Sequence, residues 1–296
     1  WPSFPDIVRV NDGTPVIVDC GIEQGFKLTP AALQAAITPR TRWLVLNTPG
    51  NPSGAVYSRE ELAALAQVLR LHPQVLVLLD ELYEHIWFTP QAPAHWLAVA
   101  PDLRERTLLV NGVSKAYAMT GWRIGWGAGP AALVQALVVI QSQASSGPNS
   151  VAQAAATAAL QSPDQSFVQQ ARNAYARRAQ RVTQALAQVP GLALLPPGGS
   201  FFAFVHCGAL IGHLRPDGQP IASDTDLTEW LLESEGVAAV DGGAYGLSPY
   251  FRISTAASDE VLAEATARIA RAVAALKDPA AQAQAHAQPA ALEAVP

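Results

Sequence analysis

The chain has 296 residues, of which half are hydrophobic and 15% are charged, and its formal net charge is −5. This length and hydrophobic content suffice for one large domain or two smaller ones with a substantial core. Because no dense run of lysine or arginine occurs, the sequence lacks the electrostatic character of proteins that bind nucleic acids or acidic membranes. A small neutral or zwitterionic partner is therefore expected.

The longest apolar stretches, such as 75–79 and 131–140, are too short to cross a bilayer, so no membrane segment is predicted. Cys20 and Cys207 lie far apart in the sequence and neither belongs to a pattern with metal-ligand spacing. This usage is typical of buried thiols in a reducing compartment, which favours a cytoplasmic protein without a metal site.

The first half of the chain alternates helix signals with short apolar runs. Thr29 followed by Pro30 predicts a helix start, and Ser58 with Glu61 predicts a capping box before a second helix. The apolar runs cover residues 43–47, 75–80, 107–112 and 122–129. Runs that are apolar on both faces and separated by helices predict an α/β fold, in which a mainly parallel sheet carries helices on both faces.

The second half predicts a smaller α+β domain. A long amphipathic helix is expected over 163–188, followed by apolar runs at 192–196, 200–205, 237–240 and 251–255. Two further helices are expected, one over 226–235 and one that Ser258 caps.

We therefore expect a large domain over 1–168 and a small domain with the bridging helix over 169–277. Residues 278–296 contain few large apolar side chains, so a flexible tail is predicted there.

Ligands of parallel sheets gather at the carboxyl ends of the strands, so polar residues just after each apolar run are the first candidates for a site. Asn51 follows the first run, Asp80 ends the second, Tyr83 comes shortly after, and Lys115 and Arg123 follow the third.

This set of side chains suits one particular cofactor. A lysine amine among small apolar residues can attack an aldehyde, and an arginine can bind a phosphate. A buried carboxylate can keep a ring nitrogen protonated, while a tyrosine and an asparagine can donate to a phenolate oxygen. An aldehyde, a phosphate, a pyridine nitrogen and a phenolate together describe pyridoxal 5'-phosphate.

Four motifs resemble the class I/II aminotransferases, which are fold type I pyridoxal-phosphate enzymes, and the likeness is to the aspartate aminotransferase branch. The most specific is GVSKAYAMTGWRIG, which matches the lysine signature of that family. NTPGNPSG is similar to its Asn-Pro-Thr-Gly segment, DELYEH to its Asp-x-x-Tyr segment, and FRIST to the strand with its carboxylate-binding arginine.

The resemblance implies a role for each residue that matches a motif. Lys115 is implied to be the Schiff-base lysine and, after the substrate displaces it, the base that moves the α-proton. Asp80 is implied to pair with the pyridine nitrogen, and Tyr83 and Asn51 to hold the ring oxygen of the cofactor. Asn51 also falls at a substrate-binding position of the family.

The phosphate is implied to bind Arg123 with help from Ser114. Where some members carry a serine, this chain has Gly112, so one hydroxyl contact is expected to be lost. Trp1 falls where members stack an aromatic ring on the pyridine, and Arg252 is implied to bind the α-carboxylate of the substrate.

Amino acids and 2-oxo acids are the substrates that the resemblance implies, and a homodimer is the implied assembly. Family members begin well before the position of Trp1, so we expect an N-terminal segment to be missing, and this chain either to bind the cofactor weakly or not to turn over at all.

Two other functions stay open at this stage. One is a β-lyase or other α-carbon chemistry on the same fold, and the other is a non-catalytic domain that binds pyridoxal phosphate or an amino acid. Arg252 by itself is equally consistent with a structural, salt-bridged arginine. The segment 197–204 is explained by a glycine turn before a strand and is left out of the predicted site.

Overall fold

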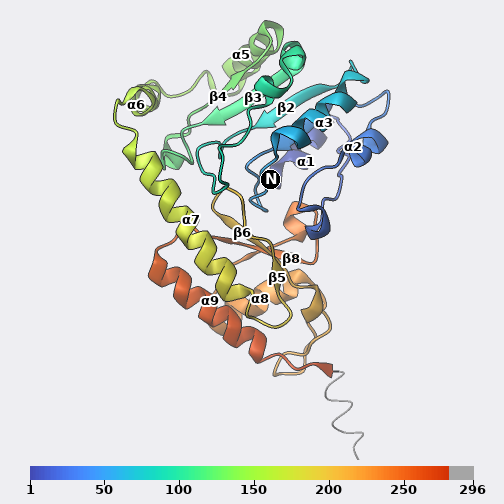
Figure 1. The fold of residues 1–296 in the computed structure, drawn as a ribbon, viewed down its shortest axis with the longest axis vertical. Coiled ribbons are helices and arrows are strands. Elements are labelled where there is room, and N and C mark those ends of the chain that lie inside the picture. The colour runs from blue at the N-terminus through green and yellow to red at the C-terminus, as the bar shows by residue number, and fades with distance from the viewer. Residues whose placement is uncertain (280–296) are drawn as a thin grey trace, which may run out of the picture. The chain divides into compact units, whose positions relative to one another are not determined.

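The computed structural model describes residues 1–279 of the chain, and these form two compact units (Figure 1). The first unit contains residues 1–180 and 196–203, and the second contains 181–195 and the residues from 204 onward. The predicted domain boundary at residue 168 falls inside helix α7 (Ser166–Leu186), which contributes to both units. Apart from residues 278 and 279, the predicted tail lies outside the described residues.

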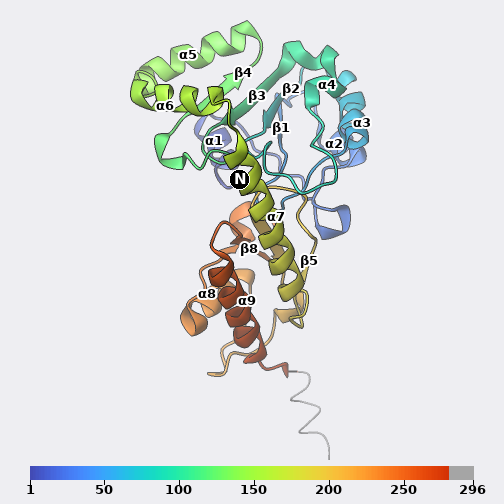
Figure 2. The ribbon, with the colours of Figure 1, turned by 60° about the vertical axis from the view of Figure 1, so that its left-hand side comes forward.

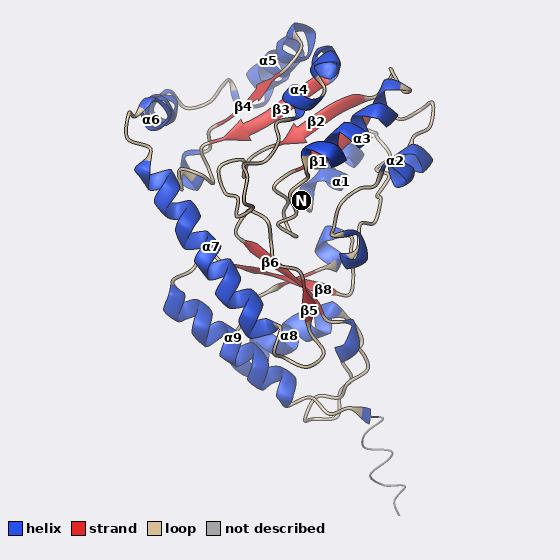
Figure 3. Ribbon diagram, viewed as in Figure 1, coloured by secondary structure: helices blue, strands red, loops and turns tan. Residues whose placement is uncertain are grey.

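The first unit is built on a four-stranded sheet of order β1-β2-β3-β4 (Figure 3). The strands are β1 (Trp43–Asn47), β2 (Leu76–Asp80), β3 (Thr107–Gly112) and β4 (Gly125–Ala128). The first three run parallel, with Asn47 opposite Asp80 and Asp80 opposite Val110. Three of the predicted apolar runs therefore form adjacent parallel strands, and the predicted α/β class is confirmed.

The fourth strand is the antiparallel member of this mainly parallel sheet. β4 pairs antiparallel with β3, and Gly112 lies opposite Gly125. A parallel neighbour needs a crossover connection, usually a helix, on one face of the sheet. The link between β3 and β4 contains only the short 3₁₀ turn η3 (Thr120–Trp122), so the chain turns back and enters the sheet in the opposite direction.

Helices α2 and α3 begin at the predicted caps. The hydroxyl of Thr29 accepts the Ala32 N–H, and the full capping box between Ser58 and Glu61 is present. The helical elements of this unit, besides α7, are α1 (Ser3–Val10), η1 (Ile22–Gln24), α2 (Pro30–Ala36), α3 (Arg59–Arg70), α4 (Trp96–Val99), η2 (Pro101–Arg106), η3, α5 (Ala131–Ser145) and α6 (Ser150–Gln161).

The core of the first unit lies between β1, β2 and the helices α2, α3 and α4. Leu65 and Leu69 of α3 are fully buried in one cluster with Val77 and Trp96. Burying each such side chain stabilises the fold by roughly 1.5–3 kcal/mol, so this contact fixes the β1–β2 edge where the candidate residues lie. Helix α5 contributes nothing to this core, because none of its residues is buried.

The second unit contains a sheet of order β5-β6-β8-β7. Its strands are β5 (Ala193–Leu194), β6 (Phe202–His206), β7 (Val240–Asp241) and β8 (Tyr250–Ser254). Its helical elements besides α7 are η4 (Gly208–Leu210), α8 (Asp224–Glu235), η5 (Gly243–Tyr245) and α9 (Asp259–Ala274), and α8 lies beside α9 (Figure 2).

Local signals in this unit predict the helices better than the strands. Ser223 caps α8, Gly236 ends it in a left-handed conformation, and Ser258 caps α9. The predicted strand over 237–240 is wrong in its extent, because pairing with β8 includes only Val240 and Asp241. A stretch of apolar residues becomes a strand only where a neighbouring strand offers partners.

No helix among residues 1–279 is long and apolar enough to span a membrane.

Candidate functional site

The candidate residues of the first unit lie where the parallel strands end. Because Asn47 of β1 is the register partner of Asp80 of β2, the loops that follow the two strands leave the sheet at the same edge. Asn51 lies in the first of these loops, and Tyr83 lies just beyond Asp80. Lys115 follows β3, the next parallel strand, so the topology brings all of these residues to one edge.

The loop after β1 is tied to the end of β2 by the side chain of Asn47. Its Nδ2 donates to the Asp80 carbonyl oxygen at 3.0 Å, and its Oδ1 accepts the Asn51 N–H at 2.7 Å. The Thr48 N–H also donates to the Asp80 carbonyl, at 3.2 Å. Sequence reasoning assigned no role to Asn47, although it opens the NTPGNPSG segment, because its side chain bonds to backbone groups that only folding brings together.

Asp80 carries a carboxyl in an unusual environment for a strand end. Burial raises the pKa of this carboxyl above its ordinary value. Two weaker effects lower the pKa: a hydrogen bond from the Leu82 N–H to Oδ1 at 3.1 Å, and the ammonium group of Lys115. Lys115 therefore lies within electrostatic range of Asp80.

Lys115 lies against two aromatic rings. Its Nζ is 5.9 Å from the ring centre of Tyr83 and 5.9 Å from that of Phe201. Tyr83 is only 4% exposed, and the two rings meet edge to face with centroids 5.4 Å apart. The amine thus projects toward aromatic faces, an arrangement that favours a cation at this point.

Phe201 comes from the segment that the sequence analysis left out. Gly54, in the loop after β1, accepts two hydrogen bonds through its carbonyl, from the N–H groups of Gly198 and Gly199 at 2.9 and 3.0 Å. The Ser200 N–H donates to the Ile86 carbonyl at 2.8 Å. These bonds fix the segment beside the candidate site, and only its PGGSFF sequence hinted at that role.

Gly54 has the conformation and the space of a required glycine. Its φ is +70°, and a Cβ atom there would lie 2.5 Å from Pro197 Cβ and 2.7 Å from the Gly199 carbonyl oxygen. Any side chain at this position would push the two segments apart.

The loop between β3 and β4 connects the remaining predicted residues. Arg123 has a left-handed backbone, with φ 55° and ψ 45°, and its Nη1 donates to the Thr120 carbonyl at 3.0 Å. The Thr120 hydroxyl donates to the Ser114 carbonyl at 3.0 Å. A left-handed conformation at a non-glycine residue is costly, and such residues are concentrated at functional sites.

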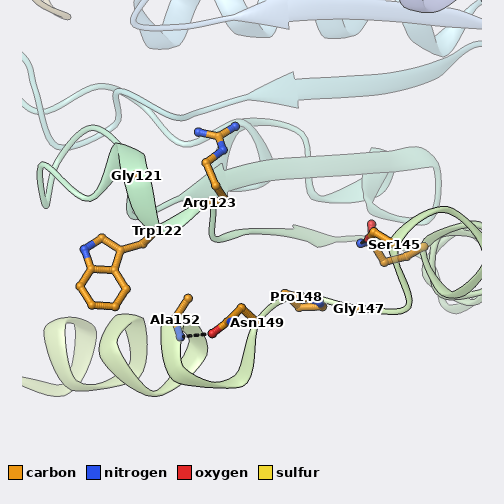
Figure 4. Close-up of a pocket in the computed structure, with 9 residues that line it drawn as sticks. Gly121, Trp122, Arg123, Ser145, Gly147, Pro148, Asn149 and Ala152 are labelled. Atoms are coloured by element: carbon orange, nitrogen blue, oxygen red, sulfur yellow. Dashed lines mark hydrogen bonds between the residues drawn. The ribbon is translucent and has the colours of Figure 1, made fainter.

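Arg123 also lines a cavity of about 490 Å³ (Figure 4). The other residues that line this cavity are Gly121, Trp122, Gln141, Ser145, Gly147, Pro148, Asn149 and Ala152. In Figure 4 the guanidinium group of Arg123 points away from α6, where Asn149 caps the helix through the Ala152 N–H at 3.0 Å. Of the predicted site residues, only Arg123 lines this cavity.

Position 112 has no room for a side chain. A Cβ atom on Gly112 would lie 2.7 Å from the Ile124 carbonyl oxygen and 3.1 Å from the Gly125 Cα. The close approach of β4 to β3 therefore requires glycine here.

Two predicted residues have different surroundings. Trp1 is 52% exposed, and its ring meets that of Phe4 edge to face at 5.5 Å. Arg252 belongs to the second unit, where it lies on β8 opposite Val240, and its guanidinium carbon is 5.3 Å from the ring centre of Tyr245.

Among residues 1–279, no group of three or more histidine, cysteine, aspartate or glutamate side chains is arranged to hold a metal ion.

Comparison with protein families gives a match over most of the chain. The family model described as Aminotransferase class I and II matches residues 1–269. The Aspartate aminotransferase of Rhizobium meliloti is 48% identical over 272 residues, which are 92% of this chain and 66% of that protein. The Aspartate/prephenate aminotransferase of Cereibacter sphaeroides is 49% identical over 269 residues, which are 91% of this chain and 67% of that protein.

Solved structures agree with the sequence comparison. The crystal structure of the aspartate aminotransferase from Rhizobium meliloti is similar with a TM-score of 0.90 at 47% identity, over 94% of this chain and 69% of that one. The aspartate aminotransferase from Thermus thermophilus with maleate gives a TM-score of 0.82 at 36% identity, over 92% of this chain and 67% of that one. The chain spans about two thirds of the length of the curated relatives that it matches.

Proposed function

Because this chain belongs to the aminotransferase class I and II family, we propose that it moves an amino group between an L-amino acid and a 2-oxo acid, with pyridoxal 5'-phosphate as cofactor. The observation that carries the proposal is the grouping of Lys115, Asp80 and Tyr83 at the edge where the parallel strands end. An amine, a carboxyl and a phenol in one cluster are the donor set that this cofactor needs.

When bound, pyridoxal phosphate supplies an aldehyde for covalent attachment and a pyridinium ring that draws electrons from the α-carbon of the substrate. We assign the attachment to the Nζ of Lys115. Once the substrate amine had taken its place, the same Nζ would act as the base that moves the α-proton. The aromatic rings of Tyr83 and Phe201 limit where the lysine side chain can swing during these steps.

We assign to Asp80 the role of pairing with the ring nitrogen of the cofactor. Burial makes a lone negative charge on this carboxyl unfavourable, as its raised pKa indicates. A protonated ring nitrogen beside the carboxylate offsets that cost, so the pair is stable where either charge alone is not. The Leu82 N–H, which donates to Oδ1, keeps one carboxylate oxygen in a fixed direction.

We assign to Tyr83 and Asn51 hydrogen bonds to the ring oxygen of the cofactor, since a phenol and a carboxamide can both donate to it. Arg123 is assigned the phosphate, because its planar guanidinium can donate two parallel hydrogen bonds to phosphate oxygens. Ser114 is linked to Arg123 through Thr120, which supports a shared role for this loop. Trp1 is proposed to cover one face of the ring.

We assign to Arg252 the binding of the substrate's α-carboxylate, and we propose that Asn51 contacts the substrate as well. A two-pronged pair with Arg252 fixes the substrate, so that the bond to the α-proton can be set perpendicular to the pyridine ring. The relatives named aspartate and aspartate/prephenate aminotransferase support a dicarboxylic amino acid as the first donor to test. We also propose a homodimer and a cytoplasmic location, on the family resemblance.

The full-length protein, loaded with pyridoxal phosphate, tests this proposal in single half-reactions. L-Aspartate should shift the visible absorbance of the cofactor toward shorter wavelength and yield one oxo acid, and addition of 2-oxoglutarate should restore the original spectrum. A β-lyase would instead release ammonia and pyruvate from a substrate with a leaving group on its β-carbon. If neither L-aspartate nor 2-oxoglutarate changed the spectrum in this way, the proposal would be contradicted.

A further inference from the structure

We propose that Asn47 is a positioning residue of this site, because its carboxamide holds the backbones of Asp80 and Asn51 in one fixed relation. This inference rests on the proposed function, in which those two residues contact the cofactor from neighbouring strands. Asn47 opens the NTPGNPSG segment, but the sequence analysis assigned a role in that segment only to Asn51.

The geometry assigns each half of the carboxamide to a different strand. Nδ2 donates to the Asp80 carbonyl at 3.0 Å, and Oδ1 accepts the Asn51 N–H at 2.7 Å. Both partners are backbone groups, one of which can only accept and the other only donate. The orientation of the amide is therefore fixed by its partners, and a rotation by half a turn would oppose oxygen to oxygen and N–H to N–H.

The loop after β1 needs such a side chain because its backbone has few donors. Pro49 and Pro52 carry no N–H, so neither can continue the hydrogen bonding of the sheet. The Asn51 N–H lies between these prolines, and the amide oxygen of Asn47 serves as its acceptor. Without the Asn47 side chain, this half-buried N–H would have to donate to a water molecule instead.

On β2, the same side chain fixes the backbone of Asp80, whose carboxyl needs a defined direction in the proposed site. The Asp80 carbonyl accepts both the Thr48 N–H and the Asn47 Nδ2. The carboxyl group extends from the same residue and is held at its other end by the Leu82 N–H. Asn47 thus fixes where the Asp80 side chain starts, and it does so without adding any charge to the site.

Two substitutions separate the two bonds. Asn47→Ala removes both, whereas Asn47→Asp keeps an acceptor for the Asn51 N–H and replaces the donor to the Asp80 carbonyl by an oxygen. The control is Thr29→Ala, which removes a side-chain bond to the backbone in the same unit, at the Ala32 N–H that starts α2. Thr29 has no part in the proposed site.

The first measurement is amide hydrogen exchange in the cofactor-free, full-length protein. Exchange at Asn51 should quicken by about tenfold or more in Asn47→Ala and stay near the wild-type rate in Asn47→Asp and Thr29→Ala. An unchanged Asn51 rate in Asn47→Ala would overturn the proposal, whether or not the protein binds a cofactor.

The second measurement is the dissociation constant of pyridoxal 5'-phosphate, from titration of its visible absorbance. Both Asn47 variants should bind about tenfold more weakly, since either loses the bond to Asp80, and the pH at which the bound chromophore changes colour should move in both. Thr29→Ala should lower the melting temperature without either effect.

If Thr29→Ala weakens binding as much as Asn47→Ala does, Asn47 acts only through stability and the proposal fails. If the wild type itself shows no binding that depends on Lys115, the proposed function fails, while the exchange rates still decide the role of Asn47.

Discussion

Replacing Gly54 by alanine tests whether the segment 196–203 is firmly fixed against the loop after β1. At φ +70° a non-glycine residue costs roughly 1–2 kcal/mol. The new Cβ would also lie 2.5 Å from Pro197 Cβ and 2.7 Å from the Gly199 carbonyl oxygen, closer than atoms can approach. Relieving such an overlap costs a further ~1–3 kcal/mol, so the expected loss of folding free energy is about 2–5 kcal/mol.

Gly25→Ala is the matched control for this substitution. Gly25 lies in the same unit with φ +63°, and the nearest atom to an added Cβ is Lys27 Cε at an ordinary 3.5 Å. This variant therefore carries only the conformational cost of about 1–2 kcal/mol.

Urea denaturation followed by tryptophan fluorescence measures both losses, and exchange at the Gly198 and Gly199 amides reports on the segment itself. Gly54→Ala should be the less stable variant by at least 1 kcal/mol, roughly the lower bound of the overlap cost. It should also lose protection at both amides. Equal stability of the two variants, with both amides still protected, would show that the segment moves aside freely and would refute this reasoning.

Two further predictions concern the core of the first unit. Trp96 is fully buried and its Nε1 donates to the Thr107 hydroxyl, so Trp96→Ala should lower the free energy of unfolding by about 3–5 kcal/mol. Trp43, whose side chain is 38% exposed, is the control, and Trp43→Ala should lower it by only about 1 kcal/mol in the same denaturation assay. Burial raises the pKa of Tyr57 to about 12, so its contribution is fully present below pH 10 and is lost as the pH rises through 12. Stability should therefore fall by up to about 3 kcal/mol more over this range in the wild type than in Tyr57→Phe, and parallel pH profiles of the two proteins would contradict the assignment.

The parts of the fold that could be predicted from sequence are those with local causes. A capping box needs only a serine and a glutamate at the right spacing, and Ser58 and Glu61 form it as predicted. The parallel strands were also predictable, because a strand buried on both faces needs a run of apolar residues. The direction of β4 was not, since it depends on how short the path from β3 is once the chain has folded.

The candidate site divides in the same way. Lys115, Asp80 and Tyr83 lie within motifs, and the structure brings them to one edge. Phe201 reaches Lys115 from a segment far away in the sequence, and Asn47, although it opens the NTPGNPSG segment, acts through hydrogen bonds to two backbone groups. Contacts of this kind exist only in the folded chain, so a single sequence carries little signal for them.

The most direct test of the central claim is reductive trapping of the cofactor. The lysines of this chain are Lys27, Lys115 and Lys277, and Lys27 is paired with Glu61. The full-length protein, loaded with pyridoxal 5'-phosphate and reduced with borohydride, should carry one pyridoxyl group, on the peptide that contains Lys115. A label confined to Lys27 or Lys277, or no label on Lys115 at full loading, would contradict the account.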